Sequence, residues 1–494
     1  MYYYLIATFA FVGYIFYKCY IHPLYLSPLR KIPGPSSDNF IFGHHASFLN
    51  FSRGEAFASL TKKYGRMFRY HSIFNQPHVV ITDPTLAQQI LITRTYDYPN
   101  FFLSRNLTKD FIGEGVTFTE GDDHKRQRKA LGPSFSLANV KEMLPTFFQA
   151  SHKMKDIWLK QIGNKKEERI TITDLVPKII LDVIGLVGFN YEFNATSPGS
   201  EIAQAYHSIV NIMPPAIYVF LADFLPVIRK ILPSFYKDQY LESVQRIHNI
   251  SDMLVSNLKN ANIRGNDIMS ILVKTNENLR ASEQLTYDEM YSQVIGILIA
   301  GHETTSVALS WTLYYLAKCP EVQDRLRKEI LDVFTDNNYF PTFEEIDSLE
   351  YLECVLKETL RKAPPLPDVM RSTSKDEIMN GYIIPKGTPL LISFYAIHHD
   401  PLIWGNDAEN FNPSRWLDPE IKSNISTSAF LPFSAGRRGC PGSKMALIEL
   451  KMIVPIIIRN FNFRMVEGFT FETRSQGFFK PVPGIDLLVS KVDY

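Results

Sequence analysis

The chain has 494 residues, and its 52 Lys and Arg residues balance 51 Asp and Glu residues, giving a formal net charge of +1. This balance gives no electrostatic reason to expect nucleic-acid binding, and a hydrophobic content of 45% is ample for a large core. The four cysteines, Cys19, Cys319, Cys354 and Cys440, are widely spaced. They form no C-x-x-C motif and do not resemble a disulfide framework, so we expect a reducing compartment.

The N-terminal segment is apolar. Residues 2–17 are uncharged, and with Lys18 reaching toward the interface the segment extends to residue 21, long enough to cross a thin bilayer. Lys18, Arg30 and Lys31 follow the apolar run and no basic residue precedes it, which places the rest of the chain in the cytosol. A cleaved signal peptide is the alternative, but the segment lacks a basic start and a clear cleavage site. We therefore expect residues 1–21 to be a single transmembrane anchor.

A hinge is expected next, over residues 22–36, before a catalytic body over residues 37–494. The segment Ile32-Pro33-Gly34-Pro35 places two prolines around a glycine. Proline cannot continue a helix, so this stretch is expected to form a stiff elbow.

The body is expected to be mostly α-helical with small β-sheets. Residues 66–82 alternate as short strands, whereas most of residues 84–360 has helical periodicity. Residues 369–395 and the tail, 460–494, return to strand and turn character. We expect the strand segments at the two ends to pair, which makes one mixed domain.

A long helix is predicted at the centre of the chain. Thr286 and Glu289 form a capping box, and helical sequence then continues to Lys318. The helix is apolar almost all round, which indicates burial. Residues 294–317 are also long enough for a second membrane span, but Glu303 at the bilayer centre would cost several kcal/mol. We therefore favour a buried helix in the soluble body.

The middle of this helix reads Ala300-Gly301-His302-Glu303-Thr304. Gly301 costs about 1 kcal/mol relative to alanine in a helix, and its role can simply be close packing. Thr304 can instead bond back to a carbonyl and loosen the helix, which would create a groove for a small ligand. A carboxylate and a hydroxyl beside that groove can relay protons.

A possible ion-pair network involves Glu358, Arg361 and Arg415. Glu358 and Arg361 lie three residues apart on one helical face, and alone they would be read as a solvated surface pair. Arg415 lies in the aromatic segment from Phe411 to Trp416. A glutamate between two arginines can form a buried bidentate network that fixes local geometry.

The segment FSAGRRGCPG, residues 433–442, carries Cys440 just before a proline. Proline is favoured at the first position of a helix, and residues 442–459 have a helical pattern. A thiol at a helix N-terminus has a lowered pKa, so Cys440 is expected to be a thiolate. Such a thiolate can act as nucleophile, redox centre or metal ligand. No second cysteine lies nearby and no histidine partner is identifiable, so a single thiolate suits haem iron.

These residues resemble a known family. Phe433, Gly436, Arg438, Cys440 and Gly442 match the F-x-x-G-x-R-x-C-x-G haem-binding signature of the cytochrome P450 superfamily. The motifs A-G-x-E-T, E-x-x-R and F-x-P-x-R occur in the family's order, at 300–304, 358–361 and 411–415. The resemblance covers essentially the whole chain and is closest in style to microsomal eukaryotic members, fungal ones included.

The resemblance implies a cytochrome P450 fold preceded by an N-terminal transmembrane helix, and haem b as cofactor with Cys440 as its axial thiolate. Arg438, Arg371 and Arg128 would bind the haem propionates, together with His124 where many members carry tryptophan. Glu303 and Thr304 would deliver protons to dioxygen. Further residues would lie along the haem or support its side of the core: Phe433, Gly436, Gly442, Ala300 and Gly301, and Glu358, Arg361 and Arg415.

The implied activity is monooxygenation of a lipophilic substrate: a sterol or steroid, a fatty acyl chain, or an aromatic compound. Electrons would come from NADPH-cytochrome P450 reductase, with cytochrome b5 as a further partner, at the endoplasmic reticulum membrane. No nucleic-acid partner is expected. A reductase-independent isomerase or dehydratase and a non-catalytic haem protein are the alternatives, and the intact acid–threonine pair favours the monooxygenase.

Two surfaces are also expected from the resemblance. Lys125, Arg126, Lys129 and Lys444 either contact an acidic reductase face or form an ordinary solvated basic face. The substrate lining is expected from residues 100–118 and 206–232, from Ile297 and Ala300, and from residues 366–369 and 478–479.

Overall fold

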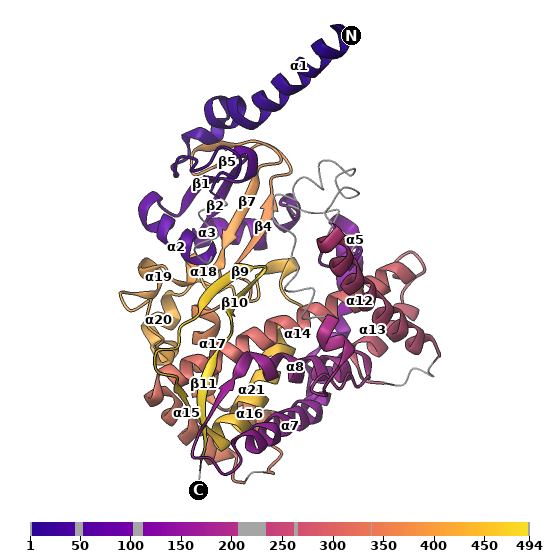
Figure 1. Ribbon diagram of the computed structural model, residues 1–494, viewed down its shortest axis with the longest axis vertical. Helices are drawn as coiled ribbons and strands as arrows, with labels where there is room; N and C mark the ends of the chain where they lie inside the picture. The colour runs from indigo at the N-terminus through magenta and orange to yellow at the C-terminus, as the bar shows by residue number, and fades with distance from the viewer. Residues whose placement is uncertain are drawn as a thin grey trace.

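The computed structural model describes residues 2–44, 53–101, 112–205, 234–260, 265–336 and 338–492. An apolar N-terminal helix, α1 (Tyr2–Phe16), projects from a mostly helical body that also contains small sheets (Figure 1). The helical path continues beyond residue 21 through a wider turn, η1 (Tyr17–Leu26), and ends in η2 (Pro28–Lys31). The most apolar window of the span Tyr2–Lys31 has a mean hydropathy of 1.4, and 6% of that window is buried in the protein.

The proline elbow lies against the first strand of the body, β1 (Met67–His71). The Arg69 amide donates to the Pro33 carbonyl at 2.8 Å, and its Nε donates to the Ile32 carbonyl at 3.1 Å. A Cβ at Gly34 would collide with the Arg69 carbonyl oxygen, so glycine permits this close approach. The elbow is therefore held against the principal sheet by hydrogen bonds to β1.

The principal sheet joins the two halves of the body. Its strand order is β1-β2-β7-β4, and β2 and β7 pair in parallel with Val79 opposite Leu390. The expected pairing between residues 66–82 and 369–395 is therefore confirmed. The remaining strands of this sheet and the adjacent hairpin are β2 (Pro77–Ile81), β4 (Asp368–Ser372), β7 (Pro389–Ser393), β5 (Glu377–Met379) and β6 (Tyr382–Ile384).

The tail forms strands as predicted, but it does not pair with residues 66–82. Its last strand instead lies between β8 and β3 (Glu168–Thr171), a strand within the stretch expected to be helical. β3 has four residues, too few to display a hydrophobic period. The tail strands are β8 (Phe461–Met465), β9 (Glu472–Gln476), β10 (Phe478–Val482) and β11 (Asp486–Lys491).

The long helix α14 (Tyr287–Lys318) crosses the middle of the body (Figure 1). Its predicted capping box is present: the Glu289 amide donates to the Thr286 hydroxyl at 3.2 Å, and the Thr286 amide donates to the Glu289 carboxylate at 2.9 Å. Two thirds of its most apolar window is buried within the protein, as expected for a core helix. α14 packs most extensively on α8 (Ile172–Phe189).

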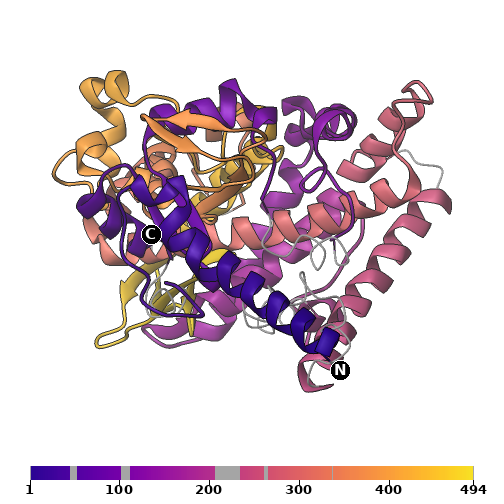
Figure 2. The same cartoon turned by 90° about the horizontal axis from the view of Figure 1, so that it is seen from above.

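The body contains further helices, several of which build the main hydrophobic core together with α14. Figure 2 shows α12 and α13 on one side of the body and the orange strands of the principal sheet on the other. These helices are α2 (Arg53–Tyr64), α3 (Pro84–Gln88), α5 (Gly121–Leu131), α6 (Leu137–Glu142), α7 (Leu144–Ile162), α12 (Ser234–Asn260), α13 (Ile268–Glu277), α15 (Pro320–Val333), α16 (Phe343–Asp347), α17 (Glu350–Lys362), α18 (Phe394–His398), α19 (Pro401–Trp404), α20 (Pro419–Asn424) and α21 (Ser443–Asn460).

Candidate functional site

Cys440 lies at the end of a tight loop that leads into α21. Its amide donates to the Phe433 carbonyl at 2.9 Å, which closes the loop on itself, and Gly442 is the N-cap residue of α21. Cys440 thus lies two residues before the N-cap, close to the predicted helix N-terminus, although Pro441 lies outside the helix rather than at its first position. Burial is the largest influence and leaves the pKa of the Cys440 thiol raised, although a hydrogen bond from the Gly442 backbone and the charge of Arg128 lower it. The expected lowering of the pKa is therefore wrong, because burial outweighs the helix N-terminus. Cys440 is nevertheless exposed, whereas Cys354 is buried. Protein atoms therefore surround Cys440 on some sides only.

Gly436 fixes the path of this loop. Its φ is +69°, and a Cβ at this position would collide with the Leu91 carbonyl oxygen of η5 (Gln89–Thr93). Both the backbone conformation and the close approach therefore require glycine. Gly442 differs: its φ is −87°, and a Cβ there would meet a Phe135 ring carbon at 3.5 Å, an ordinary contact.

This difference predicts unequal effects of two alanine substitutions. Gly436→Ala is expected to lower the free energy of unfolding by about 1–3 kcal/mol or more, because the strained backbone and the steric conflict add. Gly442→Ala is expected to change it by less than about 1 kcal/mol. Urea unfolding of both variants in the haem-free state measures the difference. Equal losses would contradict this account of the loop.

Four nitrogen-bearing side chains gather beside Cys440: Arg438 on the loop, Arg371 on β4, and Arg128 and His124 on α5. Arg438 pairs with the Glu120 carboxylate and donates to the Thr119 carbonyl at 3.1 Å. Burial and, to a smaller extent, the charge of Arg438 lower the pKa of Arg371 to about 10. Within the described ranges, the Nε atoms of Arg371 and Arg438 are buried without a hydrogen-bond partner. Buried donors of this kind call for an anionic ligand.

His124 is a neutral member of this cluster. Its Nδ1 lies 3.0 Å from the Tyr96 hydroxyl. Burial lowers its pKa to about 4, aided by the charges of Arg438, Arg128 and Arg371. A neutral imidazole whose Nδ1 accepts a hydrogen bond carries its proton on Nε2, where it can donate to a further group. Nothing in the sequence had pointed to Tyr96, which also lies beneath the Arg438 guanidinium at 5.6 Å.

Three residues in the middle of α14 are accessible, and we call them the accessible stripe. Ala300 is exposed and Gly301 and Thr304 are half-buried, whereas residues 305–313 are buried. The Thr304 hydroxyl donates to the Ala300 carbonyl at 2.7 Å, as predicted, but the helix continues without a break. A Cβ on Gly301 would lie 2.6 Å from the Ile184 Cδ1 of α8. Gly301 thus permits close packing of α14 on α8.

Glu303 lies beside this stripe but turns toward β10. Its carboxylate forms an ion pair with Lys480, and its other oxygen lies 3.6 Å from the His302 Nδ1. Between Glu303 and Thr304, both within the described part of the chain, the structure has no direct hydrogen bond. Lys480 was not anticipated, because no local pattern connects it to a residue 177 positions away.

Glu358 binds both predicted arginines. Arg361 donates to its two carboxylate oxygens at 2.8 and 2.9 Å, and Arg415 donates at 3.0 Å, all with side chains no more than 1% exposed. Trp416 Nε1 adds a further hydrogen bond at 3.0 Å. The second anion of the network is Asp407, which binds Arg415 at 2.9 Å and was not predicted. The geometry of the expected buried network is therefore confirmed.

The predicted basic face is largely neutralised within the chain. Lys125 pairs with Asp122 at 2.7 Å, and Lys129 pairs with Glu283 at 2.8 Å. Arg126 binds Glu289 through both guanidinium nitrogens, one at 2.9 Å, and so connects α5 to the start of α14. Arg126 therefore has partners within the chain, and its contact with a reductase stays a prediction. Lys444 is exposed.

Part of the expected substrate lining lies elsewhere. Phe479 is 3% exposed and stacks on Trp311 with ring centroids 5.5 Å apart, so it belongs to the core. Residues 102–111 and 206–233, which carry much of the remaining expected lining, lie outside the described residues.

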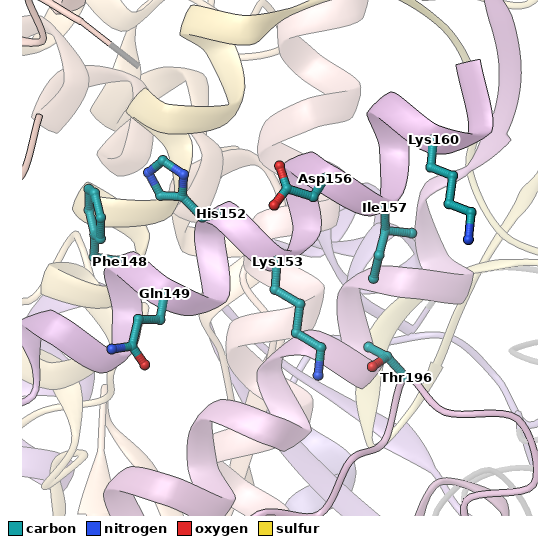
Figure 3. Close-up of a pocket in the computed structure, with 8 residues that line it drawn as sticks. All are labelled: Phe148, Gln149, His152, Lys153, Asp156, Ile157, Lys160 and Thr196. Atoms are coloured by element: carbon teal, nitrogen blue, oxygen red, sulfur yellow. The ribbon is translucent and has the colours of Figure 1, made fainter. Parts of the chain in front are cut away.

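A surface hollow of about 680 Å³ lies on the outer face of α7 (Figure 3). Lys153 points from α7 toward the side where Thr196 lies in this view, and it forms an ion pair with Asp182 at 2.7 Å. No residue predicted for the site lines this hollow. Its lining is Phe148, Gln149, His152, Lys153, Asp156, Ile157, Lys160 and Thr196.

Comparison with known proteins gives the family. The sequence model described as Cytochrome P450 matches residues 33–489. Cytochrome P450 monooxygenase claQ of Ampulloclitocybe clavipes is 31% identical over 468 residues, covering 88% of this chain and 86% of the relative. Cytochrome P450 monooxygenase 128 of Postia placenta is 29% identical over 498 residues, covering 92% and 89%. Cytochrome P450 monooxygenase sphH of Aspergillus fumigatus is 28% identical over 514 residues, covering 97% and 92%. With the motifs in order and the match spanning nearly the whole chain, this protein belongs to the cytochrome P450 family and is an oxygenase.

Proposed function

We propose that this protein is a haem-thiolate monooxygenase that inserts one atom of dioxygen into a lipophilic substrate, using electrons from NADPH-cytochrome P450 reductase. The observation that carries the proposal is the position of Cys440. Its sulfur receives a backbone hydrogen bond at the start of α21 and lies near Arg128. In the described residues, the nearby Arg371 and Arg438 each have a buried Nε atom without a hydrogen-bond partner.

The residues around Cys440 suit haem b, which offers one iron for a thiolate and two carboxylates for cationic donors. Cys440 would hold the iron. Arg438, Arg371, Arg128 and His124 would hold the propionates, and the unpartnered Nε atoms of Arg371 and Arg438 are consistent with such anions. The remaining proposed haem contacts are Phe433, Gly436, Gly442, Ala300 and Gly301.

When bound, the haem would activate dioxygen, with its thiolate ligand favouring O–O cleavage. The protein's part would be to hold Cys440 beside the Gly442 amide and the charge of Arg128, which both favour the thiolate over the thiol. Thr304 and Glu303 would move protons toward the accessible stripe of α14. Glu358, Arg361 and Arg415 would hold the core beneath Cys440 in shape.

We further propose that residues 1–21 anchor the protein in the endoplasmic reticulum membrane, that residues 22–36 form the hinge, and that residues 37–494 are the catalytic domain in the cytosol. The exposed apolar surface of α1 supports this topology. The docking of the elbow on β1 would then restrict how the body tilts on the membrane. Cytochrome b5 is a second proposed electron donor.

The decisive experiment measures turnover with NADPH and purified reductase. Sterols, fatty acids and aromatic compounds are first screened by the shift of the Soret band, and those that bind are then incubated with the full system. NADPH-dependent oxygen insertion supports the proposal. Conversion without NADPH and reductase would indicate an isomerase or dehydratase instead.

Thr304 has a testable role in this reaction. Thr304→Ala is expected to keep normal haem content but lower the product formed per NADPH by about 10-fold or more, because proton delivery loses its hydroxyl. Thr312→Ala is the matched control. Its hydroxyl makes the same bond to the carbonyl four residues back, at 2.8 Å, but is buried away from the stripe. Unchanged coupling in Thr304→Ala, or an equal loss in Thr312→Ala, would argue against the relay.

A further inference from the structure

The ion pair between Lys480 and Glu303 connects a tail strand to the central helix. Lys480 lies on β10, and its ammonium group binds the Glu303 carboxylate on α14. The Glu303 side chain is 6% exposed and the Lys480 side chain 27% exposed. The ion pair therefore joins a partly exposed lysine side chain to an almost completely buried carboxylate.

β10 is held against α14 by a second contact. The Trp311 indole donates to the Phe479 carbonyl at 2.9 Å, and the two aromatic rings stack. Because Phe479 precedes Lys480 directly, this contact fixes the strand beside Glu303. The ion pair thus rests on an ordered strand rather than on a free lysine side chain.

Lys480 is the cation that balances Glu303. A buried carboxylate needs a hydrogen-bonded counterion to remain charged. In the described ranges, His302 is a second titratable group in contact with Glu303, but burial lowers its pKa and favours the neutral imidazole. Thr304 follows Glu303 in sequence and lies on the accessible stripe. Successive helical residues point about 100° apart, so the carboxylate must turn away from Lys480 to serve the Thr304 side.

We propose that Lys480 is a positioning residue for proton delivery, a role that rests on the proposed monooxygenase function. It holds the Glu303 carboxylate at the partly solvated end of the pair and keeps its own proton. The carboxylate takes one proton from solvent, and the neutral acid leaves the ammonium group, turns and gives that proton to the Thr304 side. The regenerated carboxylate then returns to Lys480. One proton moves inward per cycle, and no electrons are transferred between these groups.

The test compares Lys480→Met, Lys480→Arg, Glu303→Gln and the double variant Lys480→Met/Glu303→Gln in the holoenzyme. NADPH and reductase are supplied without added substrate, and hydrogen peroxide released per NADPH oxidised is measured. Reduction of dioxygen to peroxide uses one NADPH and one additional proton; reduction to two waters uses two of each. Slower proton delivery therefore raises the peroxide share.

Lys480→Met is expected to raise the peroxide share several-fold, and Lys480→Arg to restore it close to wild type, because arginine renews the ion pair. In the Glu303→Gln background, Lys480→Met is expected to have no further effect. Lys328→Met on α15 is the matched control, since it removes one exposed lysine charge elsewhere and should leave the share unchanged.

A second measurement does not depend on turnover. In thermal unfolding of the holoprotein, the Tm shift of the double variant is expected to be smaller than the sum of the single shifts. Additive Tm shifts, additive effects on peroxide, or an arginine variant as impaired as the methionine variant would each overturn the role of Lys480. If wild type shows no thiolate-type carbonyl spectrum, the proposed function itself fails. With that spectrum intact, additivity rejects the Lys480 role alone.

Discussion

Cys440→Ala is expected to abolish both the thiolate-type carbonyl spectrum and NADPH-dependent oxygenation. Alanine has no ligand atom, and the other three cysteines, Cys19, Cys319 and Cys354, lie on η1, at the end of α14 and on α17. None of these elements carries the loop that presents Cys440 beside Arg128. The reduced protein is treated with carbon monoxide and its absorbance spectrum recorded, together with its haem content.

Cys319→Ala is the control for this experiment. Cys319 is half-buried between α14 and α15, and its loss should leave the carbonyl spectrum and oxygenation unchanged. A Cys440→Ala protein that retained the thiolate-type spectrum would show that another residue holds the iron. Circular dichroism establishes whether each variant is folded.

Glu358→Gln is expected to lower the free energy of unfolding by about 3–5 kcal/mol, because it leaves the buried Arg361 guanidinium without a carboxylate and Arg415 with Asp407 alone. Arg361 and Arg415 are both essentially inaccessible to water and cannot recover hydration. Arg361 would keep its bonds to the carbonyls of His398 and Ala408, at 2.7 and 2.8 Å, but these oxygens carry no net charge. Urea unfolding followed by circular dichroism measures the loss.

An exposed ion pair provides the comparison. Glu242 and Arg246 are 2.6 Å apart on α12 with side chains 63% and 45% exposed, so Glu242→Gln should cost no more than about 0.5 kcal/mol. If Glu358→Gln does not accumulate as folded protein, Arg415→Lys is used instead. It keeps a charge near Glu358 but loses the planar donor geometry, and an intermediate loss is expected. Equal costs at Glu242 and Glu358 would contradict the buried network.

Features with a local cause were predictable. The capping box of α14 needs only Thr286 and Glu289, three residues apart, and the structure contains both of its hydrogen bonds. A helix shortly after Cys440 was also predictable from the helical pattern of residues 442–459, although it begins at Ser443 and leaves Pro441 before its N-cap. The network around Glu358 was also predictable, because Arg361 lies one helical turn away and only Arg415 had to be brought from a distance.

Features that depend on distant partners were missed. β3 is too short to show a strand-like hydrophobic period in the sequence. It is a strand because β11 pairs with it. Arg126 resembled a surface cation until the fold placed Glu289 opposite it. Tyr96, Glu120 and Asp407 likewise acquire their roles only from the side chains that the fold places beside them.

The sequence by itself determined the chemistry that the site is suited to, because Cys440, its glycines and the A-G-x-E-T segment lie within short stretches whose spacing identifies the family. Only the tertiary structure decided where the charges end up. Glu303 is bound by Lys480, Arg438 by Glu120, and the Nε atoms of Arg371 and Arg438 remain without partners in the described residues. The energy of a buried charge depends on the counterion that lies within a few ångströms of it. Tertiary packing decides which counterion that is, and the two residues can be far apart in the sequence.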